Sequence, residues 1–421
     1  MTYEQFLEGK IRHKMPSGFD IPSDALNQNL FDFQKYIVRQ ALRHGKYAIF
    51  ADCGLGKTLM QLEWANQVNK GTNMPVLILC PLAVAAQTIE EGKKFGIDVN
   101  HYGEGNIQIV NYDQIDNLTA VQFSGVVLDE SSILKNLTGA TKTKILDMFA
   151  NTPFKLCCTA TPSPNDDMEI CNHAEFLSMG RSTEILAMYF THDGGDTGTW
   201  RLKGHARKRF WNFVKTWSCF VSSPADIGFD GSKFKLPKLN LIDIDVQSPI
   251  RGGRLFNDVH VSATNFNQEL RETKENRMAA VLDILDKNPK DQFIVWIKQN
   301  EEGDYLSELL TDFREVRGSD PTDKKERDLM DFAHKKYRIL VTKTKIAQFG
   351  LNFQNCHNQI FASLDFSFEG TYQAIRRSYR FGQKKPVNIY MITTDSMSNV
   401  IGAIRQKESQ FEVMKYHLTT N

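Results

Sequence analysis

The stretch that decides the fold is YAIFADCGLGKTLMQLEWA, residues 47–65. A short apolar run at 47–50 is followed by two glycines and a Lys-Thr pair, after which apolar residues recur at helical spacing. This order predicts a buried strand, a tight loop and a helix. Gly54 and Gly56 allow the backbone to turn sharply and to bring its N–H groups close to an anion, and the start of the helix adds the positive end of its dipole.

The loop has the residue types that bind the phosphates of a nucleotide. Lys57 can reach the β- and γ-phosphates, and the Thr58 hydroxyl can bind Mg²⁺. The residues expected to hold the nucleotide in this loop are Gly54, Leu55, Gly56, Lys57 and Thr58. The strict phosphate-loop pattern has glycine where this chain has Ala51. A glycine-rich turn with a solvated lysine is the alternative interpretation, and the strand-loop-helix order argues against it.

A pair of carboxylates follows a second apolar run in GVVLDESS, residues 125–132. A magnesium-nucleotide site needs a carboxylate at the end of a strand that neighbours the phosphate-loop strand. Asp129 is expected to hold the metal, directly or through water, and Glu130 to polarise the attacking water. Acidic residues also cap strands and helices, but their position after a phosphate-loop strand favours the catalytic interpretation.

Short apolar runs alternate with amphipathic stretches over most of the chain. Strands are expected at 47–50, 76–80, 107–110, 125–130 and 155–160, and then at 293–297, 338–341, 358–362 and 387–392. Helices are expected at 59–68, 83–94, 140–150, 265–287, 302–313, 323–335, 371–380 and 397–415. This alternation is typical of parallel sheets with helices on both faces, and its two series predict two α/β units.

The segment 165–240 has a different character. It is aromatic and basic, and a Gly/Asp-rich break interrupts it at 192–200. We interpret it as a mainly helical insertion and linker, through which protein partners would bind. The predicted domains are therefore a first lobe at 1–164, this insertion at 165–240 and a second lobe at 241–421.

The part of this segment at 200–217 offers two interpretations. Its cations are Arg201, Lys203, Arg207, Lys208, Arg209 and Lys215, and its tryptophans are Trp200, Trp211 and Trp217. The cations can contact phosphates without regard to sequence, and the tryptophans can stack on bases. Alternatively, a helix packs Phe210, Phe213, Val214 and Trp217 inward and turns its cations to solvent. Both interpretations stay open for the tryptophans, and we expect Arg201, Lys203 and Arg207 to contact nucleic acid.

Composition sets the bounds for the chain of 421 residues. There are 51 lysines and arginines against 50 acidic residues, so any nucleic-acid surface must be local. Seven cysteines without paired spacing suit a reducing compartment. No segment approaches the ~18 uninterrupted apolar residues of a membrane span, and the N-terminus lacks a signal-peptide pattern. We expect no membrane partner and a cytoplasmic location, in a bacterium or a phage-infected host.

Four motifs in order carry a family resemblance: ADCGLGKT at 51–58, LDESS at 128–132, TATP at 159–162 and QAIRRSYRFGQ at 373–383. The set resembles superfamily-two helicase-like ATPases. With FGLNF at 349–353, it is similar to the SWI/SNF-related branch of DNA translocases, in a compact form that looks like phage or bacterial members. The resemblance implies two RecA-like lobes in tandem, ATP with Mg²⁺ as cofactors, and DNA, either duplex or single-stranded, bound without sequence preference.

Further residues gain candidate roles from this resemblance. Gln34 in LFDFQKYIVRQAL, residues 30–42, would read the adenine edge, and Gly350 would face the nucleotide. The residues that would grip one nucleic-acid strand are Asn111 and Tyr112 in the first lobe, and Thr344 and Lys345 in the second.

The catalytic set is completed from the second lobe. Arg377 and Arg380 follow Gln373 by four and seven residues, as the arginine fingers of the family do, and helical spacing would put them on one face. Such arginines stabilise charge on the transferring phosphoryl group, an effect of ~10³–10⁵ in rate. A basic helix face that forms surface ion pairs is the alternative. The expected catalytic residues are thus Lys57, Asp129, Glu130, Gln373, Arg377 and Arg380.

The function expected from the motifs and the resemblance is an ATP-dependent DNA motor that hydrolyses ATP at the interface of its two lobes. A strand-separating helicase is the rival within enzymes. From another class, the chain would be a non-hydrolysing ATP-dependent nucleic-acid clamp or a scaffold subunit of a larger complex.

Overall fold

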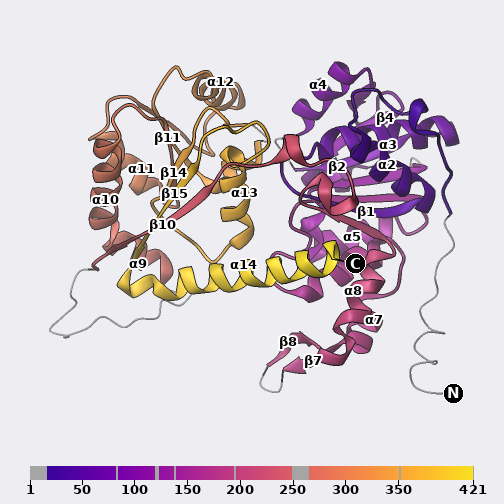
Figure 1. Ribbon diagram of the computed structural model, residues 1–421. Helices are drawn as coiled ribbons and strands as arrows, with labels where there is room; N and C mark the ends of the chain where they lie inside the picture. Colours follow the sequence, from indigo (N-terminus) through magenta and orange to yellow (C-terminus); the bar gives the residue numbers. More distant parts are fainter. Residues whose placement is uncertain are drawn as a thin grey trace. The chain divides into compact units, whose positions relative to one another are not determined.

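The computed structural model of the chain describes residues 17–81, 84–118, 123–136, 139–193, 196–248, 265–349 and 352–420. The chain divides into two compact units, Met1–Gly231 with Gln410–Asn421, and Ser232–Ser409 (Figure 1). Each unit is built on its own parallel sheet, which confirms the predicted α/β class with two parallel-sheet lobes. Among the described helices, none has the length and apolar character that a membrane span requires.

The first unit contains, within the described residues, a seven-stranded parallel sheet in the order β3-β4-β2-β5-β6-β1-β9. Its strands are β1 (Lys46–Ala51), β2 (Val76–Cys80), β3 (Val99–His101), β4 (Ile107–Asn111), β5 (Gly125–Asp129), β6 (Phe154–Thr159) and β9 (Ser218–Val221). Strands β2, β5 and β6 are buried along their whole length, and β1 is buried after its first residue. Burial on both faces explains why these strands read as continuous apolar runs.

The helices of this unit are α2 (Asp32–His44), α3 (Lys57–Thr72), α4 (Ala85–Phe95), α5 (Ala140–Met148), α6 (Ile170–Phe176), α7 (Ser182–Tyr189) and α8 (Arg207–Lys215). Short 3₁₀ helices lie at η1 (Ser23–Ala25), η2 (Tyr112–Asn117), η3 (Ser131–Lys135), η4 (Asp167–Glu169), η5 (Gly204–Ala206) and η6 (Pro224–Ile227). Helix α2 ends at His44, and Gly45 follows it with a φ of 71°, which favours glycine, before the chain enters β1 directly. This tight turn places α2 beside the strand that leads into the phosphate loop.

The strand order corrects one expectation about the site. Strand β5, which ends at Asp129, does not pair with β1, because β6 lies between them. In register, Cys158 of β6 is level with both Asp129 and Ile49. Two inter-strand spacings, about 10 Å in all, therefore separate the backbone of Asp129 from that of β1.

Residues 165–231 belong to the first unit and carry helices together with strands. Strand β9 adds an edge to the main sheet beside β1, and β7 (Phe190–Asp193) and β8 (Asp196–Leu202) form a separate antiparallel hairpin. Trp211 and Trp217 are buried, with 2% and 1% of their surface exposed, and Trp217 packs edge-on against Phe50. These two tryptophans thus follow the core-packing alternative.

The second unit contains, in its described part, a six-stranded parallel sheet in the order β10-β15-β14-β11-β13-β12. Its strands are β10 (Leu239–Val246), β11 (Phe293–Ile297), β12 (Phe313–Val316), β13 (Ile339–Lys343), β14 (Asn358–Phe361) and β15 (Val387–Thr394). Strand β10 extends from the segment that we predicted to be a linker. It lies at the sheet edge, which explains its alternation of half-buried and exposed residues.

The helices of the second unit are α9 (Phe266–Glu272), α10 (Lys274–Lys287), α11 (Asn300–Ser307), α12 (Thr322–Ala333) and α13 (Phe368–Ser378), and α14 (Ser398–Thr419) begins in it. Its 3₁₀ helices are η7 (Ser232–Phe234), η8 (Thr344–Phe349) and η9 (Asp395–Met397). The core lies where α10 covers the central strands, and its fully buried residues include Met278, Val295 and Ile360. Strands β11 and β14 pair at the centre of this sheet, so their carboxyl ends emerge side by side.

Candidate active site

The phosphate loop has the backbone conformation that the glycines predict. Strand β1 ends at Ala51, and Gly54 and Gly56 take φ angles of 89° and 79° before α3 begins at Lys57. Residues with a Cβ rarely adopt these angles. At Gly56 a Cβ atom would also lie 2.3 Å from the Gln34 side-chain nitrogen, so a larger residue would displace the Gln34 side chain.

Lys57 folds back onto the loop that it follows. Its Nζ donates a hydrogen bond of 2.9 Å to the backbone carbonyl of Ala51, and its side chain is half-buried. Thr58 is also half-buried, in the first turn of α3. Lys57 would have to exchange the Ala51 carbonyl for a phosphate oxygen to fulfil its predicted role.

Gln34 connects the first helix to the phosphate loop. Its side-chain nitrogen donates to the Leu55 carbonyl at 2.8 Å, and its side-chain oxygen accepts from the Phe31 N–H at 2.9 Å. The side chain is 4% exposed. Gln34 therefore braces the loop at Leu55, while Phe31 beside it is 45% exposed and stacks on Phe33, with ring centroids 6.1 Å apart.

The carboxylate pair lies at the carboxyl end of the same sheet. Asp129 ends β5 and is buried, and Glu130 follows with a φ of 54°, in the left-handed region. The Thr159 hydroxyl at the end of β6 donates to the Glu130 carboxylate at 3.1 Å and accepts from the Thr161 N–H at 3.1 Å. The TATP motif thus holds Glu130 in place.

Burial and the neighbouring carboxylate raise the pKa of Asp129 to about 7. The Lys57 ammonium and the Gln61 side chain oppose this rise. A cation stabilises a buried carboxylate that lies beside a second one, so Asp129 with the half-buried Glu130 fits a divalent metal. The described residues contain no group of three or more His, Cys, Asp or Glu side chains placed to hold a metal ion. Mg²⁺ takes one or two protein ligands and fills its shell with phosphate and water, and Asp129 can be such a ligand.

Two residues expected to grip nucleic acid lie beside this pair. Tyr112 is 7% exposed, and its hydroxyl donates to the Asp129 carbonyl at 2.9 Å. Burial raises the pKa of this tyrosine, so the hydroxyl stays protonated as a donor. Asn111 accepts a weak contact from the Cys80 thiol at 3.5 Å. With its side chain turned inward, Tyr112 would contact a strand only through its backbone.

The basic residues predicted to contact nucleic acid in the first unit differ in their surroundings. Arg201 and Arg207 are exposed. Lys203 instead donates to the carbonyls of Ala187 and Met188, which lie in the last turn of α7. Arg207 starts α8 and lies close enough to Asp167 to oppose the rise in that carboxyl's pKa, which burial takes to about 6.

The second unit carries the remaining predicted residues. Thr344 is half-buried at the start of η8 and Lys345 is exposed beside it. Gly350 lies outside the described residues. Gln373 and Arg377 are on α13, four residues apart and therefore on one face.

Arg380 does not lie on the helix where the sequence predicted it. Helix α13 ends at Ser378, two residues before it, so Arg380 does not share a helical face with Arg377. Its guanidinium donates to the side chain of Asn352, and Gly382 follows with a φ of 93°. Asn352 belongs to the FGLNF motif, so this hydrogen bond joins the two motifs within the second unit.

Two buried residues near the carboxylate pair were missed. Gln61 is 0% exposed and follows Lys57 by one helical turn, a spacing that could have pointed to it. His173 on α6 is also fully buried, and its Nε2 lies 3.1 Å from the Ser131 hydroxyl. Its ring packs edge-on against Phe50 at 5.4 Å. No local pattern links His173 to Ser131, because the two are far apart in sequence.

Comparison with known proteins finds similarity to helicases. Residues 276–382 match the family described as helicase conserved C-terminal domain. The bifunctional helicase and thymine dioxygenase JBP2 of Leishmania major is 30% identical over 137 residues, which are 31% of this chain and 12% of that protein. The DNA annealing helicase and endonuclease ZRANB3 of Mus musculus is 20% identical over 457 residues, covering 93% of this chain and 41% of that protein.

A solved structure described as the SWI2/SNF2 ATPase core of Sulfolobus solfataricus in complex with dsDNA covers 94% of each chain, with a TM-score of 0.43 and 17% identity. The chain spans 12% of the JBP2 relative and 41% of the ZRANB3 relative. The match at 276–382 and these relatives confirm the resemblance to helicase-like proteins. They do not support the phage type, which stays a prediction.

Proposed function

We propose that the chain is a DNA-dependent ATPase that translocates along nucleic acid and hydrolyses ATP between its two lobes. One observation carries the ATPase part: the buried Asp129 and the half-buried Glu130 lie at the same carboxyl edge of the first sheet as the phosphate loop, close enough for Lys57 to influence Asp129. Ligands of open α/β sheets bind at this edge.

In this proposal, each candidate site residue of the first unit has a defined task. The loop amides and Lys57 bind the β- and γ-phosphates, and Gln34 holds the loop in shape through Leu55. Thr58 and Asp129 would hold Mg²⁺, which would supply positive charge to the phosphate oxygens. Glu130, fixed by Thr159, orients the attacking water and accepts its proton.

The second unit contributes positive charge in the proposal. When the two lobes close on the nucleotide, Arg377 and Arg380 stabilise the charge that develops on the transferring phosphoryl group. Gln373, on the same face of α13 as Arg377, helps to position the reacting groups. Hydrolysis then removes the link between the lobes and lets them reopen.

Each lobe contacts phosphates of the DNA backbone, and these contacts convert the cycle of closing and reopening into movement along DNA. Exposed cations such as Arg201, Arg207 and Lys345 would supply contacts that do not depend on base sequence. The similarity to a DNA annealing helicase supports DNA as the partner. A cytoplasmic location and protein partners at 165–240 remain predictions.

The test compares ATP turnover with duplex DNA, single-stranded DNA and RNA in parallel, together with displacement of a triplex strand and unwinding of a fork. We expect stimulation by DNA and triplex displacement without fork unwinding. Fork unwinding would favour the strand-separating helicase. ATP binding without phosphate release, at any nucleic-acid concentration, would overturn the proposal in favour of a non-hydrolysing clamp.

A further inference from the structure

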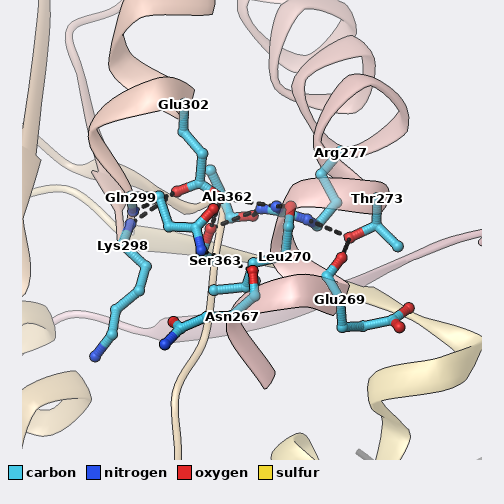
Figure 2. Close-up of polar contacts among 10 residues, drawn as sticks. All are labelled: Asn267, Glu269, Leu270, Thr273, Arg277, Lys298, Gln299, Glu302, Ala362 and Ser363. Atoms are coloured by element: carbon cyan, nitrogen blue, oxygen red, sulfur yellow. Dashed lines mark hydrogen bonds and ion pairs between the residues drawn. The ribbon is translucent and has the colours of Figure 1, made fainter. Parts of the chain in front are cut away.

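The carboxyl ends of β11 and β14 leave the second sheet side by side, and a buried polar network joins them (Figure 2). At its centre Arg277 of α10 and Glu302 of α11 form an ion pair of 2.7 Å, with side chains 1% and 0% exposed. Arg277 also donates to the Ala362 carbonyl and the Ser363 hydroxyl, both at 2.6 Å. The arginine thus holds the chain where it leaves β14.

Glu302 holds the chain where it leaves β11. One carboxylate oxygen accepts from the Lys298 N–H at 2.8 Å and from the Gln299 N–H at 3.1 Å (Figure 2). The other oxygen accepts from the Ser363 hydroxyl at 2.5 Å. Because a buried ion pair is stable only when its remaining donors and acceptors are satisfied, these bonds fix the two strand exits relative to each other.

A second ion pair joins the same two exits closer to the surface. The Lys298 ammonium binds the Asp365 carboxylate, and their side chains are 37% and 23% exposed. Lys298 is the first residue after β11, and Asp365 lies four residues after β14. Both pairs therefore connect one exit to the other, one from within the core and one at its rim.

Asp365 also leads directly into α13. Its other carboxylate oxygen accepts from the Ser367 N–H at 2.9 Å. Ser367 caps the helix, because its hydroxyl accepts from the Gly370 N–H at 3.1 Å. A continuous path of bonds thus runs from Lys298 through Asp365 to the first turn of the helix that bears Gln373 and Arg377.

We propose that Lys298 and Asp365 are positioning residues, whose ion pair ties the exit of β11 to the start of α13 and so sets the place of Gln373 and Arg377. This inference rests on the proposed function for the role of those two residues. The buried Arg277–Glu302 pair fixes the two strand exits relative to each other, and the Lys298–Asp365 pair orients α13 relative to them.

The Lys298–Asp365 pair is the one to alter, since removing one partner of the buried pair would strongly destabilise the whole unit. In the full chain, Lys298→Met and Asp365→Asn are made singly and together, with Lys298→Arg as the conservative variant. Lys287→Met is the matched control, because Lys287 pairs with Asp283 on α10 and their side chains are 70% and 59% exposed.

Hydrogen exchange in the full chain without nucleotide provides the readout that does not depend on activity. We expect the amides of Gly370 and Thr371 to exchange about tenfold faster in Lys298→Met and Asp365→Asn, with the melting temperature little changed. Lys287→Met should leave them as in the wild type. Unchanged exchange in both Lys298→Met and Asp365→Asn would overturn the inference, whatever the ATPase results.

ATPase kinetics test the consequence for catalysis. At saturating DNA we expect kcat to fall about tenfold in Lys298→Met with the KM for ATP unchanged, and Lys298→Arg to retain most of the rate. The double variant should be no slower than the single ones, because the pair acts as a unit. If only the DNA concentration for half-maximal rate changes, Lys298 is a nucleic-acid contact and the inference is wrong. If the wild type lacks DNA-stimulated hydrolysis, the proposed function itself fails.

Discussion

The Tyr112 hydroxyl donates a hydrogen bond of 2.9 Å to the backbone carbonyl of Asp129. This bond joins η2, which follows β4, to the end of β5, where the carboxylate pair lies. Asn111, the last residue of β4, and Tyr112 were expected to contact a nucleic-acid strand. The bond therefore gives a direct physical path from that segment to the residue predicted to hold magnesium.

Tyr112→Phe removes this bond and leaves the Asp129 carbonyl without its buried donor, at a cost of about 1–3 kcal/mol in stability. We expect the stimulation of ATPase activity by DNA to fall several-fold, with basal activity nearly unchanged, because the path from η2 is cut. Phosphate release with and without DNA measures both. Tyr416→Phe, at a position 64% exposed, is the matched control. Equal stimulation in the two variants would contradict this role.

Gln34→Ala removes the brace between the first helix and the phosphate loop. The Leu55 carbonyl and the Phe31 N–H each lose a buried partner. At about 1 kcal/mol for each bond, we expect the KM for ATP to rise about tenfold or more. Lys35→Ala, at the adjacent position of α2, should leave KM as in the wild type. A normal KM for Gln34→Ala would show that the loop keeps its shape alone.

His173 gives the first unit a defined pH dependence. Burial lowers the pKa of this histidine to about 4, whereas in the unfolded chain it takes its ordinary value near 6.5. Between these values the unfolded state binds a proton that the folded state does not. Its contribution to stability is therefore complete above pH 6.5 and is lost as the pH falls towards 4, by about 3 kcal/mol in all.

The raised pKa of Asp129 acts in the opposite direction over part of the same range, so the comparison must be made between variants. Denaturant unfolding of the wild type and His173→Gln at pH 7.5 and at pH 5 gives the difference. We expect the wild type to lose more stability than His173→Gln on acidification, and exposed His205→Gln to behave as the wild type. Parallel losses in the wild type and His173→Gln would disprove the assignment.

Glu302→Ala should destabilise the second unit strongly. It leaves the Arg277 guanidinium buried without its carboxylate, which costs about 3–5 kcal/mol. Asp283→Ala, which breaks an exposed pair on α10, should cost less than about 1 kcal/mol. Thermal unfolding of both variants provides the comparison. A small effect of Glu302→Ala would mean that water replaces the carboxylate.

Local patterns were enough to predict most of the framework. Strand β11 has the bounds that were expected, and the phosphate loop follows from two glycines whose backbone angles no other residue tolerates well. Edge and short strands were missed because their residues are not continuously apolar. Strand β10, with Asp243 and Asp245 on its exposed face, and the four-residue β12 show this limit.

The site was predictable as a set of motifs, whereas its contacts were not. The inward turn of Tyr112 and the bond from His173 to Ser131 depend on partners distant in sequence. The place of Arg380 depends on Asn352 and on the end of α13, which helical periodicity alone extended too far. The insertion of β6 between β1 and β5 is likewise a property of the sheet and not of any local stretch.

Release of phosphate from ATP, measured with and without duplex DNA, tests the central claim most directly. The comparison takes the wild type, Lys57→Ala, Arg377→Ala and, as a control on the exposed end of α3, Lys70→Ala. We predict hydrolysis that DNA stimulates in the wild type and the control, and a loss of about a hundredfold or more in the other two variants. DNA-stimulated hydrolysis that survives intact in Lys57→Ala would contradict the account.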